Sequence, residues 1–210
     1  MKKKFLIGLS LLASVAMRGE TKQVTQNEFE GYLFAYFEGG GNIMKQEQLR
    51  FALSNDGINW RALNENRPII ASDTISESGG IRDPHILRGE DGKFYLVATD
   101  MFTHKYGWGS NPGIVMLKSD DLIHWTHTEV RIDQRFPEEF GELGCAWAPE
   151  IIYDPSVGKM MVYFTIRKEA GGRTKLYYSY ANDDFTDLVT EPKILFEYPN
   201  EKIQVLDADI

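Results

Sequence analysis

Residues 54–60 (Ser-Asn-Asp-Gly-Ile-Asn-Trp) and residues 119–125 (Ser-Asp-Asp-Leu-Ile-His-Trp) share the pattern Ser-x-Asp-x-x-x-Trp. A weaker third copy begins at Asn182, at nearly the same interval further along the chain, and has Leu188 in place of the Trp. Self-similarity at a fixed period is typical of repeat architectures, so this pattern is the first guide to the fold.

Each copy of the pattern has the same sequence surroundings. An aromatic and β-branched run precedes it (residues 32–37, 94–99 and 161–165), and a second apolar run leads directly into it (residues 49–53, 113–118 and 175–180). Such runs are typical of strands, and the pattern itself predicts a turn followed by an outer strand that carries the Trp. Asp91-Gly92 predicts a hairpin turn after the innermost strand of the second unit.

A second set of equivalent residues opens the units. Residues 83–86 (Asp-Pro-His-Ile), 148–151 (Ala-Pro-Glu-Ile) and 207–210 (Asp-Ala-Asp-Ile) align with one another at close to the interval of the first pattern. A unit of about sixty residues with four strands is typical of a β-propeller blade. The alternative, a jelly roll or sandwich, does not predict three copies in phase. The sequence therefore predicts an all-β propeller.

Polar residues at the start of the inner strands are candidates for a site, because these strands line the axis of a propeller. Asp83, Ala148 and Asp207 hold equivalent positions, so two carboxylates recur at one level of this central funnel. Strand alternation gives the residues two positions further on the same orientation: His85, Glu150 and Asp209. Hydrolysis of a glycosidic bond requires two carboxyl groups across a cleft, one protonated and one ionised. A turn residue is the alternative for Asp83, and the recurrence at Asp207 favours the site.

Four motifs in this order and phase resemble glycoside hydrolase family 43. They are residues 80–86, the Ser-x-Asp-Leu-x-x-Trp of residues 119–125, residues 147–151 and residues 205–210. The resemblance runs from about Tyr32 to the last residue. It implies a five-bladed propeller, represented here by roughly three blades, that removes arabinofuranosyl or xylosyl units from plant polysaccharide by exo action with inversion.

The resemblance also implies roles for single residues. Asp83 matches the general base that activates water, and Asp207 matches the residue that tunes the pKa of the general acid. The acid itself is a Glu of a later blade in such enzymes, and no residue here matches it. We therefore expect the acid to lie beyond Ile210, the chain to be a truncated front portion, and this portion alone to be inactive.

Five further residues are candidates for substrate binding. Trp108 and Trp147 could form apolar walls for a sugar ring, although core packing is the alternative. Arg82, beside the base, could pair with a carboxylate or remain a solvated flank. His85 and Glu150 face the funnel by strand parity, whereas Trp60 and Trp125 belong to the repeat and are assigned to packing between blades.

The charge of the chain limits its partners. Lys and Arg number 23 against 31 Asp and Glu, and the net charge of −8 is scattered rather than clustered. Nucleic-acid binding needs a basic stripe, so nucleic acid is excluded as a partner and an oligo- or polysaccharide is compatible. The four His residues show no metal-ligand spacing. No cofactor is expected, although the resemblance allows a structural calcium ion held by the missing part. Cys145, the only cysteine, is expected to be a structural thiol.

The N-terminus predicts export. Three Lys residues follow Met1, and residues 5–16 carry no charge and are too short to span a bilayer comfortably. We expect a signal peptide over residues 1–16, a linker over 17–30 and a partial propeller catalytic domain over 31–210. The protein would then be secreted or periplasmic, with no membrane span after cleavage. A buried N-terminal helix and an uncleaved anchor are the alternatives.

Two other functions remain open. One is a non-catalytic propeller that binds carbohydrate and keeps the funnel without the acid. The other is a galactofuranosidase of the same family.

Overall fold

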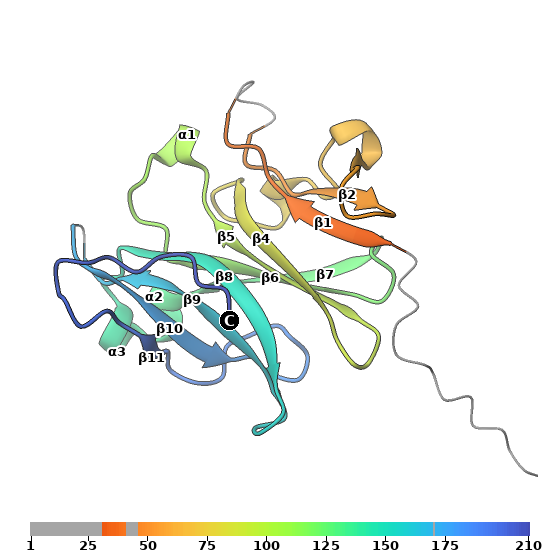
Figure 1. The fold of residues 1–210 in the computed structure, drawn as a ribbon. Helices are drawn as coiled ribbons and strands as arrows, with labels where there is room; N and C mark the ends of the chain where they lie inside the picture. Colours follow the sequence, from red (N-terminus) through yellow and green to blue (C-terminus); the bar gives the residue numbers. More distant parts are fainter. Residues whose placement is uncertain (1–30, 41–45, 170) are drawn as a thin grey trace, which may run out of the picture. The chain divides into compact units, whose positions relative to one another are not determined.

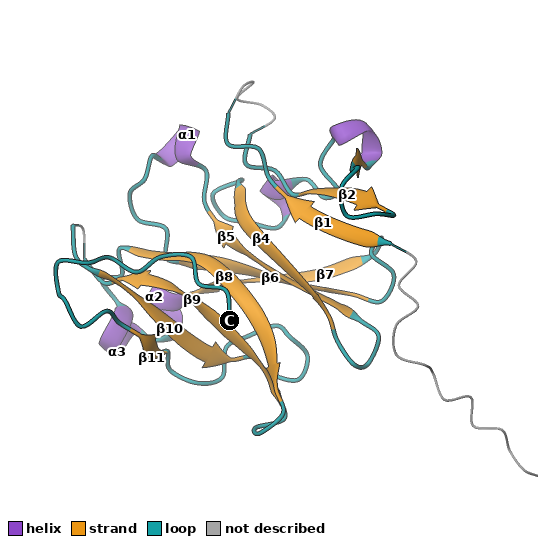
Figure 2. Cartoon of the chain, viewed as in Figure 1, coloured by secondary structure: helices purple, strands orange, loops and turns teal. Residues whose placement is uncertain are grey.

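The structure, a computed structural model, describes residues 31–40, 46–169 and 171–210. The predictions for residues 1–16 and 17–30 lie outside these residues. The described chain folds mainly into three antiparallel sheets, with short helices in the loops (Figures 1 and 2). None of the helices in this part of the chain is long or apolar enough to cross a membrane.

The first sheet has three strands and the other two have four, each in sequence order. The first comprises β1 (Tyr32–Tyr36), β2 (Arg50–Ser54) and β3 (Arg61–Ala62). The second comprises β4 (Ile81–Arg88), β5 (Phe94–Asp100), β6 (Gly113–Ser119) and β7 (Trp125–Arg131). The third comprises β8 (Cys145–Asp154), β9 (Lys159–Arg167), β10 (Thr174–Tyr180) and β11 (Lys193–Phe196). The helical turns are η2 (Asn64–Asn66), η3 (Ser72–Thr74), α1 (Thr103–Tyr106), α2 (Ile132–Arg135) and α3 (Pro137–Phe140).

The predicted turns explain the sequence repeat. Ser119 Oγ accepts hydrogen bonds from the backbone N–H groups of Asp121 and Leu122, and Asp121 Oδ1 accepts those of the next two residues. Residues 54–59 repeat these bonds. The residue after the Asp has a positive φ in all three copies: Gly57 (72°), Leu122 (65°) and Phe185 (59°).

The second sheet is buried on both faces, because successive strand residues point to opposite sides. Tyr95 and Val97 pack in one hydrophobic cluster with the third sheet, whereas Leu96 and Ala98 pack in another cluster with the first sheet. A sheet that is apolar on both faces and lies between two others is a propeller blade. About three blades are therefore present.

The two repeated Trp residues have different environments. Trp125 lies with its ring centroid 6.0 Å from that of Phe51 in the neighbouring sheet, which confirms packing between blades. The same prediction for Trp60 is not tested by the described chain. Its ring lies 5.4 Å from Phe34 of its own sheet, and the side chain is 43% exposed. The reason is that no other sheet of the described chain covers this face of the first blade.

Candidate active site

The inner strands β4 and β8 lie side by side (Figure 1). The pairing register shifts between Arg82 and His85 in β4 and between Trp147 and Glu150 in β8. A proline at each break cannot donate to the ladder, which suits a β-bulge.

The three equivalent residues share one unusual backbone conformation. Asp83 has φ 49°, Ala148 has φ 44° and Asp207 has φ 51°. These values confirm that the alignment found equivalent backbone positions. The inner strand predicted at residues 207–210 does not form, because no further strand of the described chain pairs with it.

Threonine hydroxyls bind the backbone of Ala148 and of Asp207 to the preceding sheet. The N–H of Ala148 donates to Thr99 Oγ1 at 2.8 Å, and the N–H of Asp207 donates to Thr165 Oγ1 at 3.2 Å. Thr99 on β5 and Thr165 on β9 are both fully buried. The two bonds set successive inner strands around one funnel.

The surroundings of Asp83 shift the pKa of its carboxyl group. Burial raises the pKa of Asp83, whereas a hydrogen bond from Thr99 Oγ1 to Asp83 Oδ2 (3.0 Å) and the charge of Arg82 lower it. The negative charges of Asp207 and Glu47 raise it further. Asp207 and Asp83 therefore act on the same site, and a carboxylate whose pKa is raised is a candidate proton acceptor.

The second level of the funnel joins the inner strands. The N–H of Ile151 donates to His85 Nδ1 at 3.1 Å, so the neutral ring carries its proton on Nε2. Burial lowers the pKa of His85, and the carboxylates of Glu150 and Asp209 oppose this effect. Glu150 Oε2 accepts a hydrogen bond from the Tyr163 hydroxyl at 2.6 Å. His85 and Glu150 thus come together as predicted, but each already has a protein partner.

Arg82 is held by a buried carboxylate rather than left as a solvated flank. Its Nη1 lies 2.9 Å from Oε1 of Glu47, which is fully buried. The guanidinium also lies 4.7 Å from the ring centroid of Phe37 and 4.9 Å from that of Trp108. A cation stacked on aromatic faces is fixed in orientation and partly shielded from water.

The two predicted Trp residues form one aromatic wall beside the bulges. The ring centroids of Trp108 and Trp147 are 6.2 Å apart at an interplanar angle of 85°. The guanidinium of Arg167 lies over the ring of Trp147, 4.8 Å from its centroid. Trp108 is 62% exposed, so its indole is available to a ligand, and contact with a sugar remains a prediction.

The sequence analysis missed some residues of this site. Glu47 lies in a polar loop, and its partner Arg82 is 35 residues away, so no local pattern indicates the pair. Thr99 and Thr165 stand at matching places in successive repeats, and the alignment could have shown them.

The described residues do not form a metal site by themselves. Within this part of the chain, no three His, Cys, Asp or Glu side chains come together in a way that could hold a metal ion. At the second level of the funnel, Nδ1 of His85 and Oε2 of Glu150 each already accept a hydrogen bond from a protein group. Cys145 is buried, and burial raises the pKa of its thiol to about 11, which fits a structural role.

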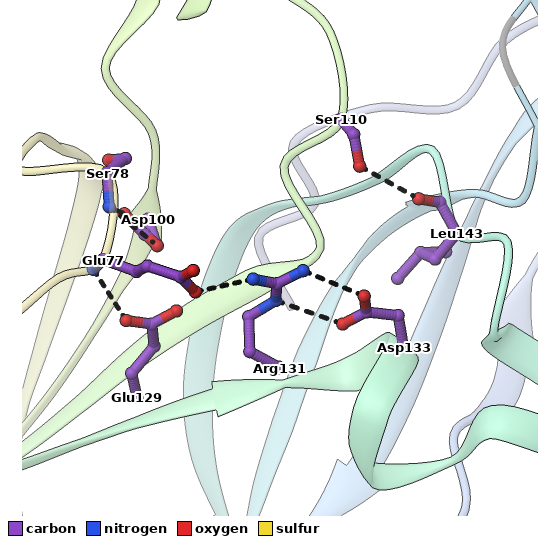
Figure 3. Close-up of polar contacts among 8 residues, drawn as sticks. All are labelled: Glu77, Ser78, Asp100, Ser110, Glu129, Arg131, Asp133 and Leu143. Carbon is purple, nitrogen blue, oxygen red and sulfur yellow. Dashed lines mark hydrogen bonds and ion pairs between the residues drawn. The ribbon is translucent and has the colours of Figure 1, made fainter.

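A polar cluster behind β4 fixes the segment that enters this strand (Figure 3). The N–H of Glu77 donates to Glu129 Oε2 at 2.7 Å, and the N–H of Ser78 donates to Asp100 Oδ1 at 3.0 Å. Arg131 lies between Glu77 and Asp133 and pairs with both (Figure 3). Burial, together with the neighbouring Asp100 carboxylate, raises the pKa of Glu129 to about 8. The raised pKa favours the protonated form of Glu129 beside the Asp100 carboxylate.

Three stacked antiparallel sheets, with two carboxylates at equivalent repeat positions and an exposed indole nearby, define part of a β-propeller with a candidate site on its inner strands. Residues 27–210 match a family profile described as "Probable glycosyl hydrolase domain", in the group related to glycoside hydrolase family 43. The chain belongs to this family, which confirms the predicted resemblance.

Known relatives agree with this assignment. An α-L-arabinofuranosidase of Bifidobacterium longum subsp. longum is 27% identical over 143 residues, which cover 65% of this chain and 13% of the relative. An endo-arabinase of Bacteroides thetaiotaomicron superposes with TM-score 0.56 at 16% identity, covering 80% of this chain and 51% of that one. An exo-β-1,3-galactanase of Phanerochaete chrysosporium gives TM-score 0.54 at 11% identity, with 79% and 36% covered. The chain spans about half the length of these relatives or less, and the two structural matches support the propeller fold.

Proposed function

We propose that the protein is an inverting, exo-acting glycosidase that removes arabinofuranosyl or xylosyl units from plant polysaccharide. One observation carries the proposal. Asp83 and Asp207 occupy equivalent repeat positions with the same positive φ, and the charge of Asp207 acts on Asp83. Membership of a family of glycosyl hydrolases supports this chemistry, and the arabinofuranosidase relative supports the choice of sugar.

Asp83 would act as the general base. Its carboxylate takes a proton from water, the water oxygen bonds to the anomeric carbon, and the bond from that carbon to the leaving oxygen breaks. A protonated acid on the other side of the sugar gives its proton to the leaving oxygen. Asp207 would favour the protonated form of that acid, because a nearby negative charge raises the pKa of a carboxyl group.

The general acid would be a Glu that these 210 residues do not include. Besides Asp207, the carboxylate whose charge acts on Asp83 is that of Glu47, and Glu47 is fully buried against Arg82. A second candidate is a propeller that binds carbohydrate without hydrolysing it. A galactofuranosidase is the variant that would differ only in the sugar.

Substrate would be held at the rim of the funnel. Trp108 and Trp147 would contact the apolar face of a sugar ring, and Arg82, His85 and Glu150 would shape the polar side. No cofactor is required by this scheme. The N-terminal signal proposed for residues 1–16 would place the protein outside the cytoplasm or in the periplasm, where polysaccharide is met.

The test is release of sugar by the full-length protein. We expect hydrolysis of an aryl α-L-arabinofuranoside or β-xyloside, with the inverted anomer appearing first by ¹H NMR, and loss of activity in Asp83→Asn. Binding of arabino- or xylo-oligosaccharide by calorimetry, without turnover, would instead support the binding propeller. Initial release of the anomer with retained configuration would contradict the role of Asp83 as base.

A further inference from the structure

We infer that Thr99 is a positioning residue for Asp83: its hydroxyl holds Oδ2 of the carboxylate and leaves Oδ1 to receive the proton of water. The inference rests on the proposed function, because it takes Asp83 to be the base. The observation behind it is the pair of bonds made by one buried hydroxyl to two different blades.

The direction of the hydroxyl is fixed by its backbone partner. The N–H of Ala148 can only donate, so Thr99 Oγ1 must accept that bond (2.8 Å). The single hydroxyl proton is then directed to Asp83 Oδ2 at 3.0 Å. Thr99 is fully buried and β-branched, so its rotamer is restricted and no water competes for the proton.

The repeat supplies an internal comparison. Thr165 holds the equivalent place on β9 and accepts the N–H of Asp207 at 3.2 Å. The bulge residue of its own blade is Ala148, whose methyl group cannot accept a hydrogen bond. The fold therefore uses a threonine hydroxyl to seat each following inner strand, and only Thr99 of the two also reaches a carboxylate.

This contact makes the two oxygens of Asp83 unequal. Oδ2 is engaged, whereas no other group of the described chain donates to Asp83. The bond also favours the ionised carboxylate, against burial and against the charges of Asp207 and Glu47, and it acts in the same direction as Arg82. Without the hydroxyl, Asp83 would be protonated over a wider pH range and would rotate more freely.

Three variants test the inference: Thr99→Val removes the hydroxyl at nearly constant shape, Thr99→Ser keeps it, and Thr165→Val removes the matched hydroxyl. The readouts are the pH profile of kcat/KM of the full-length protein and the ¹³C carboxyl titration of Asp83. For Thr99→Val we expect kcat to fall roughly 10- to 100-fold with KM within about threefold. The acidic limb of kcat/KM and the Asp83 titration should both move to higher pH. Thr99→Ser should restore both readouts, and Thr165→Val should move the Asp83 titration less than Thr99→Val does, because Thr165 reaches Asp83 only through the placement of Asp207.

The two readouts separate the inference from the proposed function. If Asp83 titrates as in the wild type in Thr99→Val, the positioning role is wrong, even if the protein hydrolyses glycosides. If the titration moves and Thr99→Ser restores it in a protein without activity, Thr99 positions Asp83 and the proposed hydrolysis is wrong. Should Thr99→Val not fold, Thr99→Ala serves the same comparison, since it places no extra methyl group beside the carboxylate.

Discussion

The bulges of β4 and β8 have one backbone conformation and two chemistries. Asp83 and Ala148 both have a positive φ, both precede a proline, and both interrupt the pairing register at the same point. One presents a carboxylate to the funnel and the other a methyl group. A left-handed conformation costs a residue with a Cβ about 1–2 kcal/mol, and both blades tolerate it.

The difference separates what the fold needs from what the site needs. Ala148 shows that the bulge forms without a hydrogen bond from the side chain of the bulge residue itself. The carboxylate of Asp83 is therefore not required by the blade, and its raised pKa and its link to Asp207 point to chemistry. The predictions below test this separation in order of decreasing effect.

Removing the charge at one bulge should affect activity alone. In the full-length protein, Asp83→Asn should lower kcat/KM by about 10²- to 10⁴-fold, because the base is lost while the side-chain shape is kept. Ala148→Gly should stay within about threefold of wild type, since glycine adopts the left-handed conformation readily. Similar losses in both variants would show that the bulge itself, rather than the carboxylate, determines activity.

The covered and uncovered blade faces should differ in stability. Leu96, the third residue of β5, is fully buried, whereas Phe34, the third residue of β1, is 51% exposed. Urea unfolding should show a loss of about 2–5 kcal/mol for Leu96→Ala and less than about 1 kcal/mol for Phe34→Ala. Phe34→Ala should also reduce self-association in sedimentation, because it removes an exposed aromatic ring. Equal losses of stability would mean that the first blade is covered in solution.

The second and third blades should differ in the pH dependence of their stability. In the second blade, Asp100 follows Thr99 and its carboxylate interacts with Glu129. In the third blade, the residue that follows Thr165 is the apolar Ile166. The pKa of Glu129 is raised to about 8 in the folded state, so folding binds a proton between its ordinary pKa and pH 8, and stability falls as pH rises through this window.

Thermal unfolding of Glu129→Gln checks this effect. The amide cannot ionise, so the variant should lose much of the decrease between about pH 4.5 and pH 8, with a Tm about 3–6 °C above wild type at the alkaline end. Glu138→Gln, at an exposed position, is the control and should follow the wild type. An unchanged slope in Glu129→Gln would mean that Glu129 is ionised at neutral pH.

The repeated turns should respond alike. Ser119→Ala and Ser54→Ala each remove the acceptor of two backbone N–H groups. Each should lower the free energy of unfolding by about 0.5–1.5 kcal/mol in urea. A loss confined to one blade would argue that the repeat marks something other than architecture.

The fold could be predicted from the sequence because the repeated residues form hydrogen bonds with their near neighbours in the chain. The Ser-x-Asp turns and the positive φ values fall at the spacing of the motif, so aligning residues also aligned backbone positions. The packing of Trp60 stays a prediction, because it depends on a face that the described chain leaves uncovered. The strand predicted at residues 207–210 was wrong because a strand needs a neighbour as well as a pattern.

The site was predicted less completely, because its supporting contacts cross between distant segments. The ion pair of Arg82 with Glu47 and the electrostatic interaction of Glu129 with Asp100 each join residues that lie far apart in the sequence. No periodicity connects them. Asp83 and Asp207 were found because both occupy a position that the repeat defines.

The most direct test of the account is the ¹³C titration of the Asp83 carboxyl group in the wild type and in Asp207→Asn. The account predicts that Asp83 titrates above the ordinary range of an aspartate in the wild type. It also predicts that its pKa decreases when the charge of Asp207 is removed. An Asp83 pKa that is ordinary in the wild type and unchanged in Asp207→Asn would contradict the claim that these two repeat positions bring their carboxylates to one site.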